Sequence, residues 1–302
     1  MPVSLTDEVR TSCALIAERA TAVRIDEDAL ASFAAGVGPI ADAVLDARHH
    51  LVDTERSDVA MAMLVGGAVN FGSGWFPTLR KRIDPTTGRP VSGSITVSWS
   101  LTEHHRAHGV WTAAQLRTLR TDALAAVLRQ NADHELMSLY AQALRSLGQF
   151  LGERSAIEVI DEASGSAVAL AAALADGMAL FADRGFYKRA QIVANDLALA
   201  GAASFSDLDD LTVFADNLVP HVLRCEGVLA YDERLAAHID AGRLLPFGTW
   251  EREIRGCAVH ACERLAALLA VPPRTLDTWL WNRGQAPEFK ARPRHRCRCI
   301  WY

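Results

Sequence analysis

Residues 186–196 read Phe-Tyr-Lys-Arg-Ala-Gln-Ile-Val-Ala-Asn-Asp, and this stretch decides how the chain is expected to fold. Its apolar and small residues favour a helix, but Lys188 and Arg189 follow Phe186 and Tyr187 directly. Burying an unpaired charge costs several kcal/mol, so each cation needs a partner or an anionic ligand if the helix is buried. A lysine among aromatic residues suits a phosphate or a catalytic carboxylate. A solvent-exposed helix face is the ordinary alternative.

A second stretch, residues 211–220, reads Leu-Thr-Val-Phe-Ala-Asp-Asn-Leu-Val-Pro and places Asp216 among apolar residues. Pro220 follows closely, and the residue before a proline tends to leave the α region, so Asp216 is expected on a turn or a first helical turn. Two interpretations remain open. Asp216 is either an N-cap, which is common before a helix, or a functional carboxylate.

Outward from these stretches, the chain is expected to be mainly α-helical, because apolar residues recur every three or four positions. The one strand or hairpin signal is Ser-Ile-Thr-Val-Ser-Trp-Ser-Leu at 94–101, where polar and apolar residues alternate. We expect a single body over residues 1–302, with an N-terminal helical part over about 1–110 and a motif-bearing helical part over about 111–302. The expected helices cover 5–20, 27–45, 56–70, 112–152 with a break near 131–133, 168–182, a segment after Gly185, 221–230, 232–242, 251–270 and 274–283.

The composition excludes several classes of protein. Half of the 302 residues are hydrophobic, 22% are charged, and the formal net charge is −5. These proportions are ordinary for a globular protein, and the negative charge argues against a nucleic acid polymer as partner. No run of about 18 uncharged apolar residues is present, so we expect no membrane-spanning helix and a cytoplasmic location.

Neither a metal nor another cofactor is expected. Cys257 and Cys262 are five residues apart, and Cys297 and Cys299 are two apart, so neither pair has the usual C-x2-C spacing of a zinc site. The six cysteines are more simply reduced thiols. No Walker loop is present and no glycine-rich fingerprint follows a strand, which disfavours ATP and NAD.

Three further groups of residues could carry chemistry. Asp277 lies among tryptophans and leucines, and is either a buried carboxylate or a first-turn residue that favours the helix dipole. Asn70, Phe71 and Trp75 could form an aromatic slot for a flat base, although aromatic residues in helical proteins more often belong to the core. The arginine-rich segment 290–298 could be a solvated tail, or could dock and bring an arginine to a phosphate.

Four linked segments resemble the queuosine salvage family, a group of N-glycosylases that release queuine from queuosine 5′-monophosphate. A fifth match consists of Leu276, Asp277, Leu280 and Trp281, and Asn70-Phe71 resembles the family's Asn-Phe before a tryptophan. The four segments are Phe186 to Ile192, Phe214-Ala215-Asp216 with Pro220, Glu253-Ile254-Arg255-Gly256-Cys257, and His295 to Tyr302.

The resemblance implies a helical fold similar to helix-hairpin-helix DNA glycosylases, and hydrolysis of an N-glycosidic bond without metal or cofactor. The alternating pattern at 94–101 adds a small β-hairpin insertion to the expected fold. Asp216 would stabilise the oxocarbenium-like sugar and activate water. Asp277 would recognise the base or position the neighbours of Asp216. Lys188 would keep the carboxylate ionised or bind the 5′-phosphate. Phe214 and Trp75 would stack on the base. The remaining candidates for substrate binding are Tyr187, Arg189, Asn70, Phe71, His221, Arg296 and His50.

Several positions depart from the family's pattern and leave the base open. They are Asn217, Leu218, His221, His260 and Asn282. Two alternatives therefore stand beside the queuosine assignment: a non-catalytic binder of modified nucleosides, and a glycosylase for a different modified nucleotide.

Overall fold

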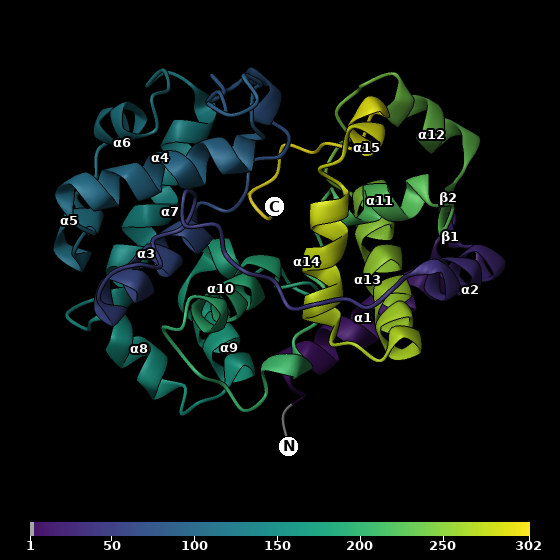
Figure 1. Cartoon of the computed structure of the whole chain (residues 1–302), viewed down its shortest axis with the longest axis horizontal. Helices are drawn as coiled ribbons and strands as arrows, with labels where there is room; N and C mark the ends of the chain where they lie inside the picture. The colour runs from purple at the N-terminus through teal and green to yellow at the C-terminus, as the bar shows by residue number, and fades with distance from the viewer. Residues whose placement is uncertain (1–2) are drawn as a thin grey trace.

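The computed structural model describes residues 3–302 and is built almost entirely of helices (Figure 1). Two short strands, β1 (Val23–Ile25) and β2 (Leu229–Tyr231), pair antiparallel, with Ile25 opposite Leu229. Three 3-10 helices cover Phe76–Thr78, Ala179–Phe181 and Leu208–Asp210. The α-helices are α1 (Leu5–Arg19), α2 (Glu27–Gly36), α3 (Arg56–Ala68), α4 (Gly93–His108), α5 (Ala113–Arg117), α6 (Thr121–Val127), α7 (Glu135–Leu151), α8 (Ala156–Glu162), α9 (Ala167–Gly177), α10 (Lys188–Leu199), α11 (Val219–Cys225), α12 (Glu233–Asp240), α13 (Thr249–Leu269), α14 (Pro273–Arg283) and α15 (Pro287–Ala291).

The predicted mainly α class with a small β element is confirmed, but the strand predicted at 94–101 is wrong. These residues form the first half of α4. The Ser92 side chain accepts a hydrogen bond from the backbone N–H of Ile95 and caps the helix. Thr96, Val97, Ser100 and Leu101 are buried, which is the spacing of a helix face rather than of a strand. The likeness to helix-hairpin-helix glycosylases stays a prediction.

The helix predicted over 27–45 ends early, at Gly36. Gly36 and Gly38 weaken the helix, and Pro39 has no backbone N–H to continue it. Residues 37–46 contain no regular secondary structure, and the segment runs across the front of the molecule from α2 to α3 (Figure 1). This segment forms part of the wall of the site described below.

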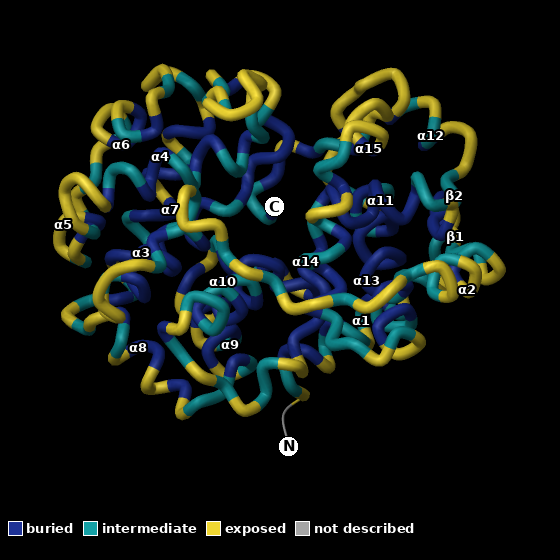
Figure 2. Tube along the Cα trace, in the orientation of Figure 1, coloured by how far each residue is buried: buried dark blue, intermediate teal, exposed yellow. Residues whose placement is uncertain are grey.

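Two hydrophobic cores organise the molecule. The larger core is formed mainly by buried side chains of α1, α3 and α4 through α10. The smaller core lies around β1, β2, α11, α13 and α14. Figure 2 shows buried chain inside each of the two halves and exposed chain at their outer rims. Residues on both sides of position 110 contribute to each core, and the single domain over 1–302 stays a prediction.

The two halves meet along α1 and α13, which pack against each other. Their contact includes Gly256, where a Cβ atom would lie 2.5 Å from Cγ2 of Ile16. The C-terminal segment returns between the halves (Figure 1), and the carbonyl oxygen of Tyr302 accepts a hydrogen bond from the Gly72 N–H at 2.9 Å. In the described part of the chain no helix combines the length and the apolar character needed to cross a bilayer.

Candidate functional site

A cavity of about 470 Å³ lies where the two halves face each other. This volume is in the range of small-molecule sites. We call it the central cavity. Its walls come from the 43–51 segment, the end of α3 with residues 69–76, the first half of α4, one face of α10, residues 214–218, α14, Arg294 and Tyr302.

Lys188 is the first residue of α10 and points its ammonium group into the central cavity. Tyr187 before it has a φ of 48°, a left-handed conformation that turns the chain into the helix. The Lys188 Nζ donates to the carbonyl oxygen of Asn70 at 3.0 Å and to its Oδ1 at 2.9 Å. Burial lowers the pKa of Lys188 to about 8, while Asp216 and Asp277 favour its charged form. The lysine is thus fixed by neutral acceptors, and it faces carboxylates without a direct ion pair.

Asp216 is half-buried and lies on the turn before α11. Its Oδ1 accepts hydrogen bonds from the backbone N–H groups of Leu218 and Val219, at 2.8 and 2.9 Å. Asp216 is not the N-cap itself, because that position is Leu218, but it binds the first backbone N–H groups of α11 from two residues earlier. The same side chain lines the central cavity. Among the described residues no donor binds its Oδ2, which leaves one carboxylate oxygen available to a ligand.

Asp277 lies on α14, is buried, and also lines the central cavity. Its Oδ1 accepts a hydrogen bond from the backbone N–H of Phe214 at 2.9 Å, which fixes the segment that carries Asp216. Burial and the neighbouring Asp216 raise the pKa of Asp277 well above its usual range. A carboxyl group with a raised pKa takes up a proton more readily, and in that form it can donate a hydrogen bond.

A buried ion network supports the same segment from behind. The Arg255 guanidinium donates to Asp183, to Glu251 at 3.2 Å, and to the carbonyl oxygen of Ala215 at 3.0 Å. All three charged side chains are buried. Arg255 also lies over the Phe186 ring, 4.0 Å from its centroid. This arginine therefore links α13 to the residue that precedes Asp216.

Arg294 gives one end of the central cavity a positive charge. Burial lowers the pKa of Arg294, and the nearby Asp216 opposes that effect. The pKa of Lys81, which lies outside the cavity wall, is lowered to about 8 by burial and by the charge of Arg294. Neither cation forms an ion pair with a carboxylate in residues 3–302. Ser92 and Ser94 at the start of α4 line the cavity too, and a helix N-terminus favours anions.

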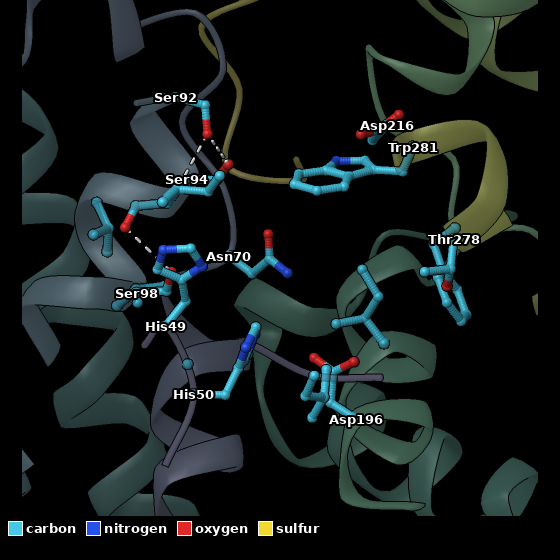
Figure 3. Close-up of a pocket in the computed structure, with 18 of the residues that line it drawn as sticks. His49, His50, Asn70, Ser92, Ser94, Ser98, Asp196, Asp216, Thr278 and Trp281 are labelled. Carbon is cyan, nitrogen blue, oxygen red and sulfur yellow. Dashed lines mark hydrogen bonds between the residues drawn. The ribbon is translucent and has the colours of Figure 1, made fainter. Parts of the chain in front are cut away.

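The opposite end of the central cavity is acidic. Asp196 on α10 and His50 from the 43–51 segment face each other there, well away from Asp216 and the serines (Figure 3). Asp196 was not among the residues predicted from the sequence. The sequence could have indicated this residue, because the spacing of Lys188, Ile192 and Asp196 places all three on one helix face.

Seven of the predicted residues line the central cavity. Lys188, Asp216 and Asp277 are accompanied by Asn70, Phe71, Phe214 and His50. Phe71 is only 1% exposed and packs edge-on against Tyr140, so it contributes one edge of its ring to the wall. Trp281 of α14, which was not predicted as a binding residue, extends into the cavity near Asp216 (Figure 3).

Tyr187, Arg189 and Trp75, which were predicted to bind substrate, do not line the central cavity. The Tyr187 hydroxyl donates to the Glu8 carboxylate at 2.8 Å. Arg189 follows Lys188 on the helix and so points elsewhere: it donates to the carbonyl oxygen of Ala68 at 2.7 Å and lies between the rings of two phenylalanines. The Trp75 indole N–H donates to Glu135 at 2.7 Å. All three side chains stabilise the larger half of the molecule.

His221 and Arg296, also predicted to bind substrate, lie outside the lining of the central cavity. His221 is buried beneath α15, with its Nε2 2.7 Å from the carbonyl oxygen of Phe289. Arg296 donates weakly to the Gly242 carbonyl oxygen, at 3.4 Å. The tail does dock, as one of the two interpretations held, but it brings Arg294 to the cavity. Within residues 3–302, no three His, Cys, Asp or Glu side chains converge as metal ligands would.

Comparison with known proteins agrees with this geometry. The family model described as queuosine salvage protein matches residues 76–302. A queuosine 5′-phosphate N-glycosylase/hydrolase of Sphaerobacter thermophilus is 33% identical over 319 aligned positions, which cover 97% of each chain. Proteins of the same name from Dictyostelium discoideum and Mus musculus are 38% and 36% identical, over 39% of this chain and 40% of theirs. The chain belongs to the queuosine salvage protein family.

Proposed function

We propose that this protein hydrolyses the N-glycosidic bond of queuosine 5′-monophosphate and releases the base queuine. The observation that carries the proposal is the set of Asp216, Lys188 and Asp277 in one cavity with a cationic end. Family membership supports the reaction class. The six free cysteines suit a reducing compartment, and we place the reaction in the cytoplasm.

Asp216 is proposed as the catalytic carboxylate. As the bond between C1′ and N9 breaks, its electron pair leaves with the base and positive charge develops on the sugar. The free Oδ2 of Asp216 can stabilise that charge and accept a proton from the attacking water, whose oxygen forms the new bond to C1′. The two backbone donors on Oδ1 hold the carboxylate in place during this step.

Asp277 and Lys188 are proposed to act on the base and on the charge balance of the site. A protonated Asp277 can donate a hydrogen bond to the departing base, which becomes more basic as it gains electrons. Asp216 favours the charged form of Lys188, which keeps an ammonium group beside the reacting bond. Trp281 and Phe214, rather than the predicted Trp75, offer aromatic surface for stacking on the deazaguanine ring.

The 5′-phosphate is proposed to bind at the cationic end. Arg294 offers a guanidinium fork, Lys81 adds a second positive charge, and Ser92 and Ser94 add hydroxyl donors at a helix N-terminus. Arg294 lies near Asp216, and Ser92 and Ser94 are well separated from Asp196 in Figure 3. A phosphate at this end would place the ribose beside Asp216.

The direct test is incubation of the purified protein with queuosine 5′-monophosphate, with the free base followed by chromatography. We expect queuine and ribose 5-phosphate to form in equal amounts. Tight binding without any release would instead favour the non-catalytic binder, and release from another modified nucleotide alone would favour the third interpretation.

The phosphate subsite gives a separate expectation for Arg294→Gln. Loss of a charge-assisted contact should raise KM for the 5′-monophosphate at least about tenfold, because such contacts contribute about 1.5–3 kcal/mol. Hydrolysis of the dephosphorylated nucleoside should change little. The matched control is Arg296→Gln, two residues along the same segment but outside the cavity. Equal KM values for both variants would place the phosphate elsewhere.

A further inference from the structure

Asp196 is a charged group of the central cavity that the reaction above does not use. It lies eight residues after Lys188 on the same face of α10, which corresponds to about 12 Å along the helix axis. Both side chains line the cavity, so α10 carries a cation near the bond to be broken and a carboxylate at the far end.

The Asp196 carboxylate has few hydrogen-bond or ion-pair partners among the described residues. Its Oδ1 accepts a long hydrogen bond of 3.4 Å from the neighbouring Asn195 side chain, and no cation pairs with it within residues 3–302. His50 faces it across the cavity, and the Nδ1 of that ring lies 3.1 Å from the Asp46 carbonyl oxygen (Figure 3). Burial raises the pKa of Asp196. A carboxylate in this position is stabilised by a cationic ligand.

The charges follow an order along the cavity. Arg294 lies near Asp216, and Lys188 and Asp277 also lie near Asp216. Asp196 lies near Lys188 and Asp277 but well away from Asp216 in Figure 3. An anionic group would be repelled at the Asp196 end and attracted at the Arg294 end. A ligand that fits this order is negative at one end and positive at the other.

Queuosine 5′-monophosphate has that distribution of charge. Its phosphate is negative, and the side arm on its deazaguanine base contains a secondary amine that is protonated at neutral pH. We propose that the Asp196 carboxylate binds this ammonium group, and so selects bases that carry a charged arm over plain or neutral-armed deazaguanines. The inference rests on the proposed function and names the part of the substrate that Asp196 recognises.

The test compares two free bases that differ in the charge of a small arm. We would measure the Kd of 7-aminomethyl-7-deazaguanine and of 7-cyano-7-deazaguanine by calorimetry, for the unmodified protein and for Asp196→Asn. The unmodified protein should prefer the cationic base at least about tenfold, and Asp196→Asn should bring the ratio of the two Kd values close to one. The matched control is Asp176→Asn, the same change at an exposed position of α9, which should keep the preference.

Turnover of queuosine 5′-monophosphate, measured in parallel, separates this inference from the proposed function. Asp196→Asn should raise KM about tenfold or more with kcat within about threefold, because the arm is remote from the bond that breaks. Equal affinity of the unmodified protein for both bases, or binding of neither, would overturn the inference even if queuine is released. A preference for the cationic base without any release would leave the role of Asp196 standing and refute the hydrolase. If Asp196→Asn does not fold, the Kd ratio of the unmodified protein alone decides.

Discussion

Asp216→Asn is expected to lower kcat for queuine release about a thousandfold. The amide cannot accept a proton from water, and it does not offer a negative charge to the developing oxocarbenium ion. Its side-chain oxygen can still accept the hydrogen bonds from Leu218 and Val219, because the amide oxygen of asparagine is an acceptor like a carboxylate oxygen. The variant should therefore fold and bind substrate. Initial rates and calorimetric binding of the 5′-monophosphate would check both expectations.

Asp232→Asn is the matched control for this change. Asp232 caps α12 by accepting a hydrogen bond from the Leu235 N–H, and it does not line the central cavity. The same substitution at the same kind of position should leave kcat unchanged. An Asp216→Asn enzyme within tenfold of the unmodified rate would show that another group activates the water.

Arg255→Met is expected to lower the free energy of unfolding by about 3–5 kcal/mol, the usual cost of breaking a buried ion pair by removing one partner. The change leaves Asp183 and Glu251 buried without their cation, and the Ala215 carbonyl oxygen loses its donor. Urea denaturation would measure the loss. The surviving folded protein should also show a lower kcat, since Ala215 positions Asp216.

The control for Arg255 is Arg264→Met on the same helix. Arg264 pairs with Glu27 at the surface, where solvent screens the interaction, so a far smaller loss is expected. If both variants lose equal stability, the buried network does not stabilise the fold. Replacing Arg255, Asp183 and Glu251 together by apolar residues of similar size should recover much of the loss, because no unpaired charge then remains.

The sequence predicts the helices well, because their apolar spacing persists whatever they pack against. The strand prediction for residues 94–101 of α4 is wrong. Ile95, Val97 and Trp99 alternate with polar residues, and this alternation is typical of a strand. Of these three, Val97 alone is buried, whereas the polar Thr96 and Ser100 lie on the buried face. Such burial depends on neighbours such as Phe76, whose ring packs against Gly93, and these contacts come from the fold and not from local sequence.

The sequence could identify those residues of the site whose charged side chains lie within apolar stretches. Lys188, Asp216 and Asp277 are ionic residues in apolar stretches, and all three line the cavity. The sequence could not decide between Arg294 and Arg296, because residues two apart in an extended segment are about 7 Å apart and only one reaches a given cavity. Arg189 lies in an apolar stretch as Lys188 does, yet its guanidinium donates to a carbonyl oxygen and lies against two aromatic rings outside the cavity.

The pairing of β1 with β2 has a consequence for how the protein is made. β1 leaves the ribosome well before its partner strand β2, and before the helices α11, α13 and α14 that complete the smaller core. Most of the larger core is available earlier. Contacts between such distant parts of a chain form slowly, since a long loop must be ordered first. Asp277 and Arg294 follow β2 along the chain, so the wall of the central cavity is completed only after both strands have been synthesised.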